Sequence, residues 1–198
     1  VTAYSALAVT DPAAVTAAQV AAGMVASYGV QYRNDRSRMD TFSAVSTAGQ
    51  AALQAALRQF VDATATLNAT QRTTLRTAAR ASIAYDTPSS RDLGSFMGRV
   101  AAATSLPATV RSAAAGVTAA LSAAVVAKTA DQRGSSGVAI YLPTTSDGYL
   151  ASYARDAQTF TQATGWDQFA RWLATGTRAA SATAAAGRGA TRGGARWA

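Results

Sequence analysis

The sequence contains no cysteine, no histidine and no glutamate, and its only lysine is Lys128. Without cysteine the chain has no disulfide, no thiolate nucleophile and no soft metal site. Without histidine it lacks the usual general base and the commonest ligand of transition metals. These absences exclude catalysis by a cysteine–histidine pair within this chain, and they leave its redox compartment undecided.

Long apolar runs are also absent, since charged or polar residues interrupt every apolar stretch well before the length of a membrane-spanning helix. The segment that follows Val1 lacks the basic and then apolar pattern of a signal peptide. We therefore expect no membrane span. Alanine supplies much of the apolar content and buries little area, so the core must rest on relatively few large side chains.

The net charge of +8 is unevenly distributed. Every acid is aspartate and nearly every base is arginine, which we attribute to genome composition. The residues after Asp167 include five arginines and no acid, so they carry +5 of the total. We expect 175–198, which is rich in Ala, Gly, Thr and Arg, to be a low-complexity, disordered basic tail. A uniform nucleic-acid-binding face is not expected.

Apolar residues recur at helical spacing in the first half of the chain. Thr10-Asp11-Pro12 predicts the start of a helix that runs to about Tyr28 or Tyr32. Ser46 or Thr47 is expected to cap a second helix, and Asn68 with Gln71 a third that runs to Tyr85. The second and third helices are predicted to form a helical hairpin.

The second half contains three more predicted helical segments. One opens at Arg91-Asp92-Leu93, with Asp92 as its cap, and one follows Leu106-Pro107, with Val125 facing inward. The last begins near Tyr153, pauses at Thr164-Gly165 and restarts at Trp166. Helical spacing predicts that the aromatic side chains of this region form core rather than a binding platform: Tyr153, Phe160, Trp166, Phe169 and Trp172.

Two segments are predicted to be strands. Thr41–Val45 is short and β-prone, whereas Gly137–Pro143 is an unbroken apolar run that predicts a fully buried strand. A fully buried strand needs neighbours on both sides, and the rest of the chain offers few. The expected fold is therefore mainly α: a helical bundle over residues 1–174 with one or two short strands.

The segment from Gly137 to Phe169 resembles the C-terminal end of clostripain-family cysteine peptidases. The resemblance is carried by the order and spacing of apolar, aromatic and turn residues: Gly137, Ile140, Tyr141, Pro143, Tyr153, Phe160, Thr164, Trp166, Asp167 and Phe169. It extends more weakly over about 11–173, where Ser46-Thr47 replaces the Asp-Leu usual in the family.

The resemblance implies a larger caspase-like α/β fold whose catalytic core lies N-terminal to Val1. That core would hold the Cys nucleophile, the His base and an acidic pocket for Arg or Lys. No catalytic residue of the family maps onto this chain, and secretion or a cell-surface location would follow from the family. A fragmentary gene, a truncated chain and a degenerate homologue are all compatible with this interpretation.

Candidate chemistry within the chain itself is sparse. Lys128 could serve a Ser–Lys pair, but we interpret it as a cation at a helix C-terminus. The ten aspartates include no acid pair framed by aromatic residues, and several are interpreted as caps, among them Asp11, Asp92 and Asp167. No catalytic, cofactor or metal residue is assigned.

Calcium is retained as a weak alternative, because some clostripain relatives associate with it. Two aspartate pairs, Asp35 with Asp40 and Asp131 with Asp147, could supply oxygen ligands, although no EF-hand pattern is present.

Two other functions stay open beside the peptidase fragment. The first is a complete helical scaffold, and the second is a basic binding module that uses the arginine-rich tail.

Overall fold

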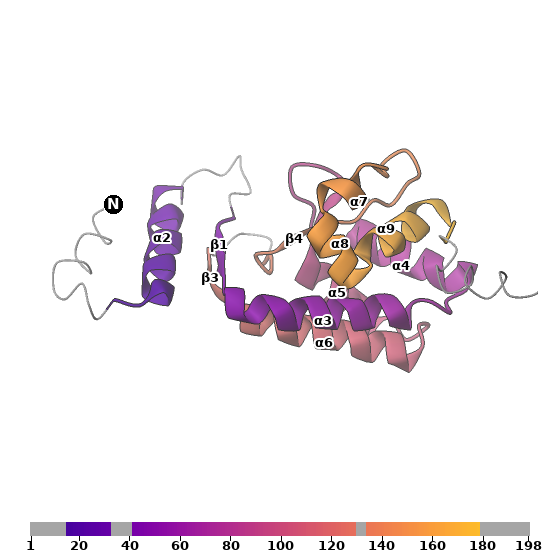
Figure 1. Cartoon of the computed structure of the whole chain (residues 1–198), viewed down its shortest axis with the longest axis horizontal. Helices are drawn as coiled ribbons and strands as arrows, with labels where there is room; N and C mark the ends of the chain where they lie inside the picture. Colours follow the sequence, from indigo (N-terminus) through magenta and orange to yellow (C-terminus); the bar gives the residue numbers. More distant parts are fainter. Residues whose placement is uncertain (1–14, 33–40, 130–133, 179–198) are drawn as a thin grey trace, which may run out of the picture.

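The computed structural model describes residues 15–32, 41–129 and 134–178. Over these residues the protein is mainly helical, with eight helices and two antiparallel sheets of two strands each, so the predicted mainly helical class is confirmed. Most helices form one body, and α2 lies apart from it at one end (Figure 1).

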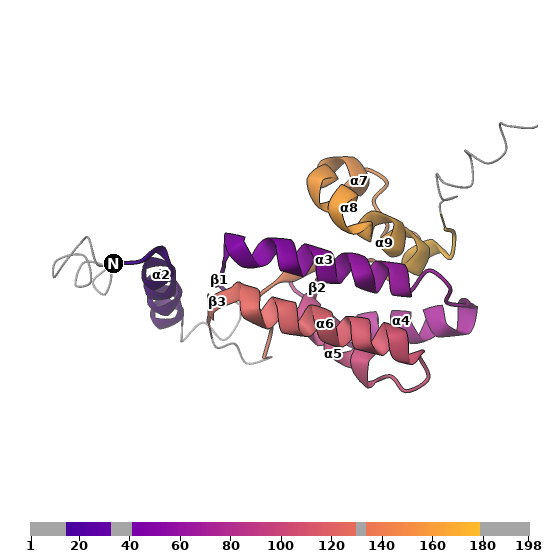
Figure 2. The ribbon, with the colours of Figure 1, turned by 60° about the horizontal axis from the view of Figure 1, so that its bottom comes forward.

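The centre of the body is an antiparallel pair of long helices, α3 (Thr47–Ala63) and α6 (Ala108–Ala124), which lie side by side (Figure 2). The start of α3 touches the end of α6, where Ser46 N donates to Ala124 O at 2.8 Å. The predicted hairpin of α3 with α4 (Ala69–Ala81) is wrong, because α4 packs on α5 (Leu93–Ala102) and α9 (Trp166–Thr175). The alanine-rich face of α6 allows the closer fit to α3.

The C-terminal helices are α7 (Tyr153–Asp156), α8 (Gln158–Thr164) and α9, and an aromatic cluster joins α9 to α3. Phe60 on α3 lies 5.4 Å from Phe169 and 6.3 Å from Trp166 between ring centroids. Trp166, Phe169 and Trp172 are all buried, as predicted. The predicted pause is also confirmed, because Gly165 adopts φ 69° between α8 and α9.

Within the part of the chain that the structure describes, strand β4 (Ala139–Tyr141) pairs with a single neighbour, β2 (Ser90–Asp92). The prediction of a fully buried strand is therefore wrong. Ile140 and Leu142 are buried, but Ala139 is exposed, so one face of the strand meets the core and the other meets solvent.

The partner strand β2 was not predicted. Helix α4 ends at Ala81 rather than Tyr85, because Ser82 is extended and Tyr85 N donates to Ser90 O at 2.9 Å. The chain folds back on itself through this contact, which creates β2 immediately before α5.

The second sheet is a ribbon of β1 (Ser43–Val45), predicted, and β3 (Val125–Lys128), which was not. Helix α6 stops at Ala124, so Val125 is not a helical core residue and Lys128 does not lie at a helix C-terminus. Val125 and Val126 are successive β-branched residues next to strand β1, and both features favour an extended backbone over a helix.

Helix α2 (Ala17–Gln31) begins later than predicted, because Thr16 and Gln19 form a capping box. Thr10-Asp11-Pro12, from which an earlier start was predicted, lies outside the described residues. Of the apolar residues at helical spacing in this helix, only Val25 is buried, and Ala18 is exposed. Contacts between α2 and the body run through the β1–β3 ribbon, where Tyr28 stacks on Phe42 at 5.1 Å.

Candidate functional site

The most highly connected polar side chain of the described residues is Asp92, which is fully buried at the start of α5. Its Oδ1 accepts from Ser95 N at 2.7 Å, as an N-cap does. Its Oδ2 accepts from Ser136 N at 2.7 Å, Ser136 Oγ at 2.9 Å and Tyr85 Oη at 2.8 Å. The predicted cap is confirmed, and its ties to Tyr85 and Ser136 were not predicted.

The geometry makes this cluster a structural junction rather than a catalytic pair. Ser136 Oγ donates its proton to Asp92 and accepts from Gly94 N at 3.0 Å, so it is held by both neighbours. The four hydrogen bonds that the Asp92 carboxylate accepts hold it in place at the start of α5. The junction joins three segments, which are the hairpin at Tyr85, the start of α5 and the segment before β4.

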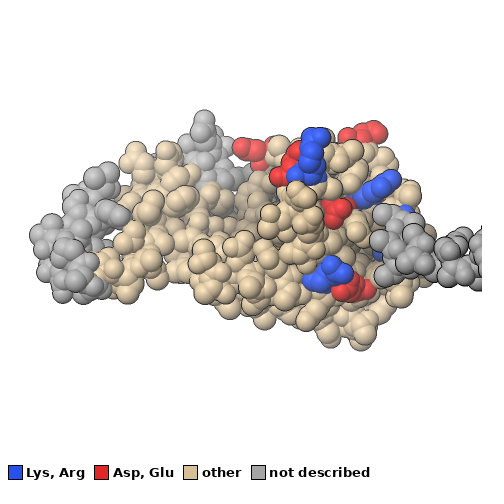
Figure 3. All heavy atoms as spheres, in the orientation of Figure 1, with Lys and Arg blue, Asp and Glu red and all other residues tan. Residues whose placement is uncertain are grey.

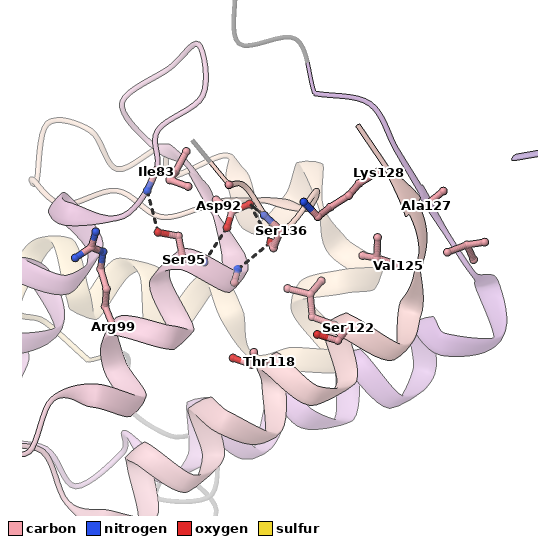
Figure 4. Close-up of a pocket in the computed structure, with 14 residues that line it drawn as sticks. Ile83, Asp92, Ser95, Arg99, Thr118, Ser122, Val125, Ala127, Lys128 and Ser136 are labelled. Carbon is pink, nitrogen blue, oxygen red and sulfur yellow. Dashed lines mark hydrogen bonds between the residues drawn. The ribbon is translucent and has the colours of Figure 1, made fainter. Parts of the chain in front are cut away.

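A cavity of about 730 Å³ lies beside this junction, between α5, the end of α6, and β3 (Figure 4). Lys128 extends from β3 toward Ser136 and Asp92, whereas Arg99 lies at the other side of the cavity. Ser122 and Thr118 line the cavity from α6. No hydrogen bond or ion pair within the described residues joins Lys128 to a serine, so the Ser–Lys pair considered from the sequence is not assembled there.

The calcium pairs lie largely outside the described residues. Asp35, Asp40 and Asp131 are among the residues that the structure does not describe, and Asp147 is exposed. Within the described ranges, no three acidic side chains gather as a metal-binding group. Asp167 lies in the first turn of α9, but it does not cap that helix, because Gly165 occupies the cap position.

Several arginines are occupied by backbone carbonyl groups. Arg76 donates twice to Thr144 O, at 2.8 and 3.1 Å, and Arg72 donates to Trp172 O at 3.2 Å near the end of α9. Arg178 donates to Thr64 O at 2.6 Å and stacks 3.9 Å above the ring of Trp172. These arginines stabilise helix ends and loops. Arg178 belongs to the segment predicted to be a disordered tail, yet its side chain packs on the body.

The tyrosines beside α9 are buried enough to resist ionisation. Burial, followed by the charge of Asp167 and the neighbouring Tyr141, raises the pKa of Tyr153 to about 12. Tyr141 Oη donates to Gly148 O at 2.9 Å, and Tyr141 O accepts from Trp166 Nε1 at 2.7 Å. Trp166 thereby anchors the last helix on β4.

The end of the molecule formed by α2, Phe42 and the β1–β3 ribbon, here called the apolar end, has few charged residues and many exposed apolar side chains. Helix α2 and strand β1 contain no charged residue, and β3 contains only Lys128. The charged side chains visible in Figure 3 all lie over the helical body. Six of the seven large apolar side chains exposed in the described residues belong to the apolar end: Met24, Val30, Tyr32, Phe42, Val45 and Val126.

No third strand within the described residues pairs with the β1–β3 ribbon, so each strand presents one unpaired edge. An unpaired edge beside exposed apolar side chains is a surface on which another chain can add. Sequence reasoning missed this surface, because it did not predict strand β3 and placed Val125 in a helix.

Comparisons with known proteins identify no relative of this chain, so a function can be argued only from its sequence and structure. No family model matches this chain, and neither a curated protein nor a solved structure shows significant similarity to it. Among the described helices, none combines the length and the apolar character needed to cross a membrane.

Proposed function

We propose that this chain is the non-catalytic C-terminal part of a clostripain-like cysteine endopeptidase, a class that cleaves after Arg or Lys. In this proposal the chain packs on a separate catalytic core through the apolar end and helps to shape the substrate cleft. The observation that carries the proposal is the concentration of exposed apolar side chains beside two strand edges that no other described strand pairs.

The character of the apolar end favours a sheet-containing protein partner over a nucleic acid. A nucleic-acid surface requires clustered cations, and the described residues of the apolar end offer only Lys128. Val45 and Val126 stand on the two strands of the ribbon, where a further strand would contact them. A catalytic core with a central sheet supplies such a strand.

The residues that resemble the family support the proposal from the other side of the molecule. Tyr141, Trp166 and Phe169 form the buried joint between β4 and α9, so they serve the stability of the body. None of them belongs to a catalytic arrangement. A chain without cysteine and histidine, built on these structural residues, fits a supporting part of a peptidase.

The test is co-fractionation in the source cells with a polypeptide whose active-site thiol reacts with an Arg-directed electrophilic probe. We expect the native chain to co-purify with the labelled polypeptide, and the pure chain alone to leave an Arg-containing peptide uncleaved. Met24→Asp and Val45→Asp place a charge in the apolar end and should abolish the association.

Leu150→Asp is the matched control, because Leu150 is exposed by 59% on the body and Met24 by 50% at the apolar end. Association lost equally in Leu150→Asp would contradict a role for the apolar end. A native chain that purifies alone, without labelled thiol, would instead favour the self-sufficient helical scaffold.

A further inference from the structure

The cavity beside Asp92 contains more cationic and donor groups than its own structure uses. Its charged lining residues are Arg99, Lys128 and Asp92, which give a formal balance of +1. Asp92 is fully buried and accepts four hydrogen bonds, so it has little capacity left for the two cations. No ion pair within the described residues involves Arg99 or Lys128.

The hydroxyl groups of the cavity add further donors. Ser95 Oγ accepts from Ile83 N at 3.2 Å, which leaves its own proton available. Ser122, an exposed residue of α6, lines the cavity without a hydrogen-bond partner in the described residues. A cavity that is rich in donors and poor in available acceptors is complementary to an anion.

The remaining wall is apolar. Ile83, Leu121 and Val125 are among its apolar lining residues. Arg99 and Lys128 lie at opposite sides of the cavity (Figure 4). The cavity volume of about 730 Å³ lies within the usual range for small-molecule sites. The ligand that matches this lining has an anionic group and an apolar body.

We infer that this cavity is a binding site for a small organic anion with an apolar body, held by Arg99, Lys128 and the hydroxyl groups of Ser95 and Ser122. The site borders the apolar end, because Val126 and Lys128 of strand β3 line the cavity. The groups that hold the anion take no part in the contacts proposed for the catalytic core, so variants of Arg99 and Lys128 test this site, whereas variants of Met24 and Val45 test the apolar end.

Naphthalene-2-sulfonate is a suitable probe, and the neutral naphthalene-2-sulfonamide has nearly the same shape. We expect the sulfonate to bind roughly tenfold more tightly than the sulfonamide, because charge-assisted hydrogen bonds are lost with the charge. Binding is measured by NMR titration at moderate salt, with the amide signals of Gly94, Ser95 and Ser136 reporting the location.

The double variant Arg99→Gln/Lys128→Met should weaken sulfonate binding by roughly tenfold. Arg58→Gln/Arg155→Gln removes the same charge from exposed pairs on the body, with Asp62 and Asp156, and should leave binding unchanged. Ser122→Phe fills the cavity from an exposed helical position, so it should abolish binding. It provides a second test if the double variant fails to fold.

Three results would overturn the site. These are equal binding of sulfonate and sulfonamide, equal losses in the two double variants, and amide shifts that map to α2 instead of the cavity. The first would show simple apolar adsorption, the second a general effect of net charge, and the third adsorption at the apolar end.

Discussion

Asp92 shows at the scale of one residue how a cap acquires a larger structural role. Many helices begin with an aspartate that accepts from one backbone N–H. Here the same carboxylate also accepts from Ser136 and Tyr85, which lie 44 positions ahead and 7 positions behind in sequence. The start of α5 is thereby fixed to the segment that leads into β4.

Replacing Asp92 with alanine is therefore expected to cost much more than the loss of an ordinary cap. The change removes the acceptor of four hydrogen bonds from partly buried donors on Ser95, Ser136 and Tyr85, so we expect a loss of about 3 kcal/mol in the free energy of unfolding. Urea denaturation followed by circular dichroism measures this difference.

Asp62→Ala is the control for this change, because Asp62 forms an exposed pair with Arg58 on α3. Its loss should cost less than about 0.5 kcal/mol. Similar destabilisation by the two substitutions would show that the Asp92 cluster has no special weight.

The pairing of α3 with α6 depends, at the scale of an element, on the absence of one side chain. A Cβ added to Gly49 would lie 2.8 Å from both Cα and Cβ of Ala124, closer than atoms can approach without a shift. Backbone atoms of α6 would have to move, since Ala124 has no flexible side chain to yield. Gly49 is thus a requirement of close helix packing, whereas Gly116, also helical, meets nothing within 4 Å.

These two glycines predict opposite responses to the same substitution. Gly49→Ala should destabilise the protein by about 1–3 kcal/mol through overpacking. Gly116→Ala should stabilise it by about 0.4–1 kcal/mol, because alanine favours the helix and nothing obstructs its methyl group. Thermal or urea unfolding of both variants gives the comparison, and stabilisation by Gly49→Ala would contradict the close approach of α3 and α6.

At the scale of the whole molecule, stability is distributed unevenly between the body and the apolar end. The body contains the aromatic cluster around Phe60 and Trp166, whereas α2 buries only Val25. A helix with so little buried surface opens at a free energy well below that of global unfolding.

Hydrogen exchange of the intact chain tests this difference. We expect the amides of α2 to exchange at least about 100-fold faster than those of α3 and α6, which corresponds to about 3 kcal/mol. Binding of the proposed core should slow exchange in α2 selectively. Equal protection of α2 and α3 in the isolated chain would mean that the apolar end is already stable without a partner.

Several features of the fold were predicted correctly from the sequence alone. Local patterns sufficed where the determinant lies within one turn of helix: Asn68 with Gln71, the cap at Asp92, and the break at Gly165 were all predicted and are confirmed. The buried aromatic positions of α9 were predicted too, because their helical spacing exposes one apolar face.

Tertiary structure alone decided the features that join distant segments. Val125 and Lys128 continue a helical pattern, yet they form a strand because β1 lies close enough to pair with them. Ser82 to Tyr85 likewise leaves the helical pattern to pair with β2. Strand pairing and the cavity beside Asp92 require partners from elsewhere in the chain, and hydrophobic periodicity describes only one segment at a time. The sequence by itself determined which residues are apolar and where helices are favoured, and the packing of those helices determined which apolar residues became core and which remained exposed at the apolar end.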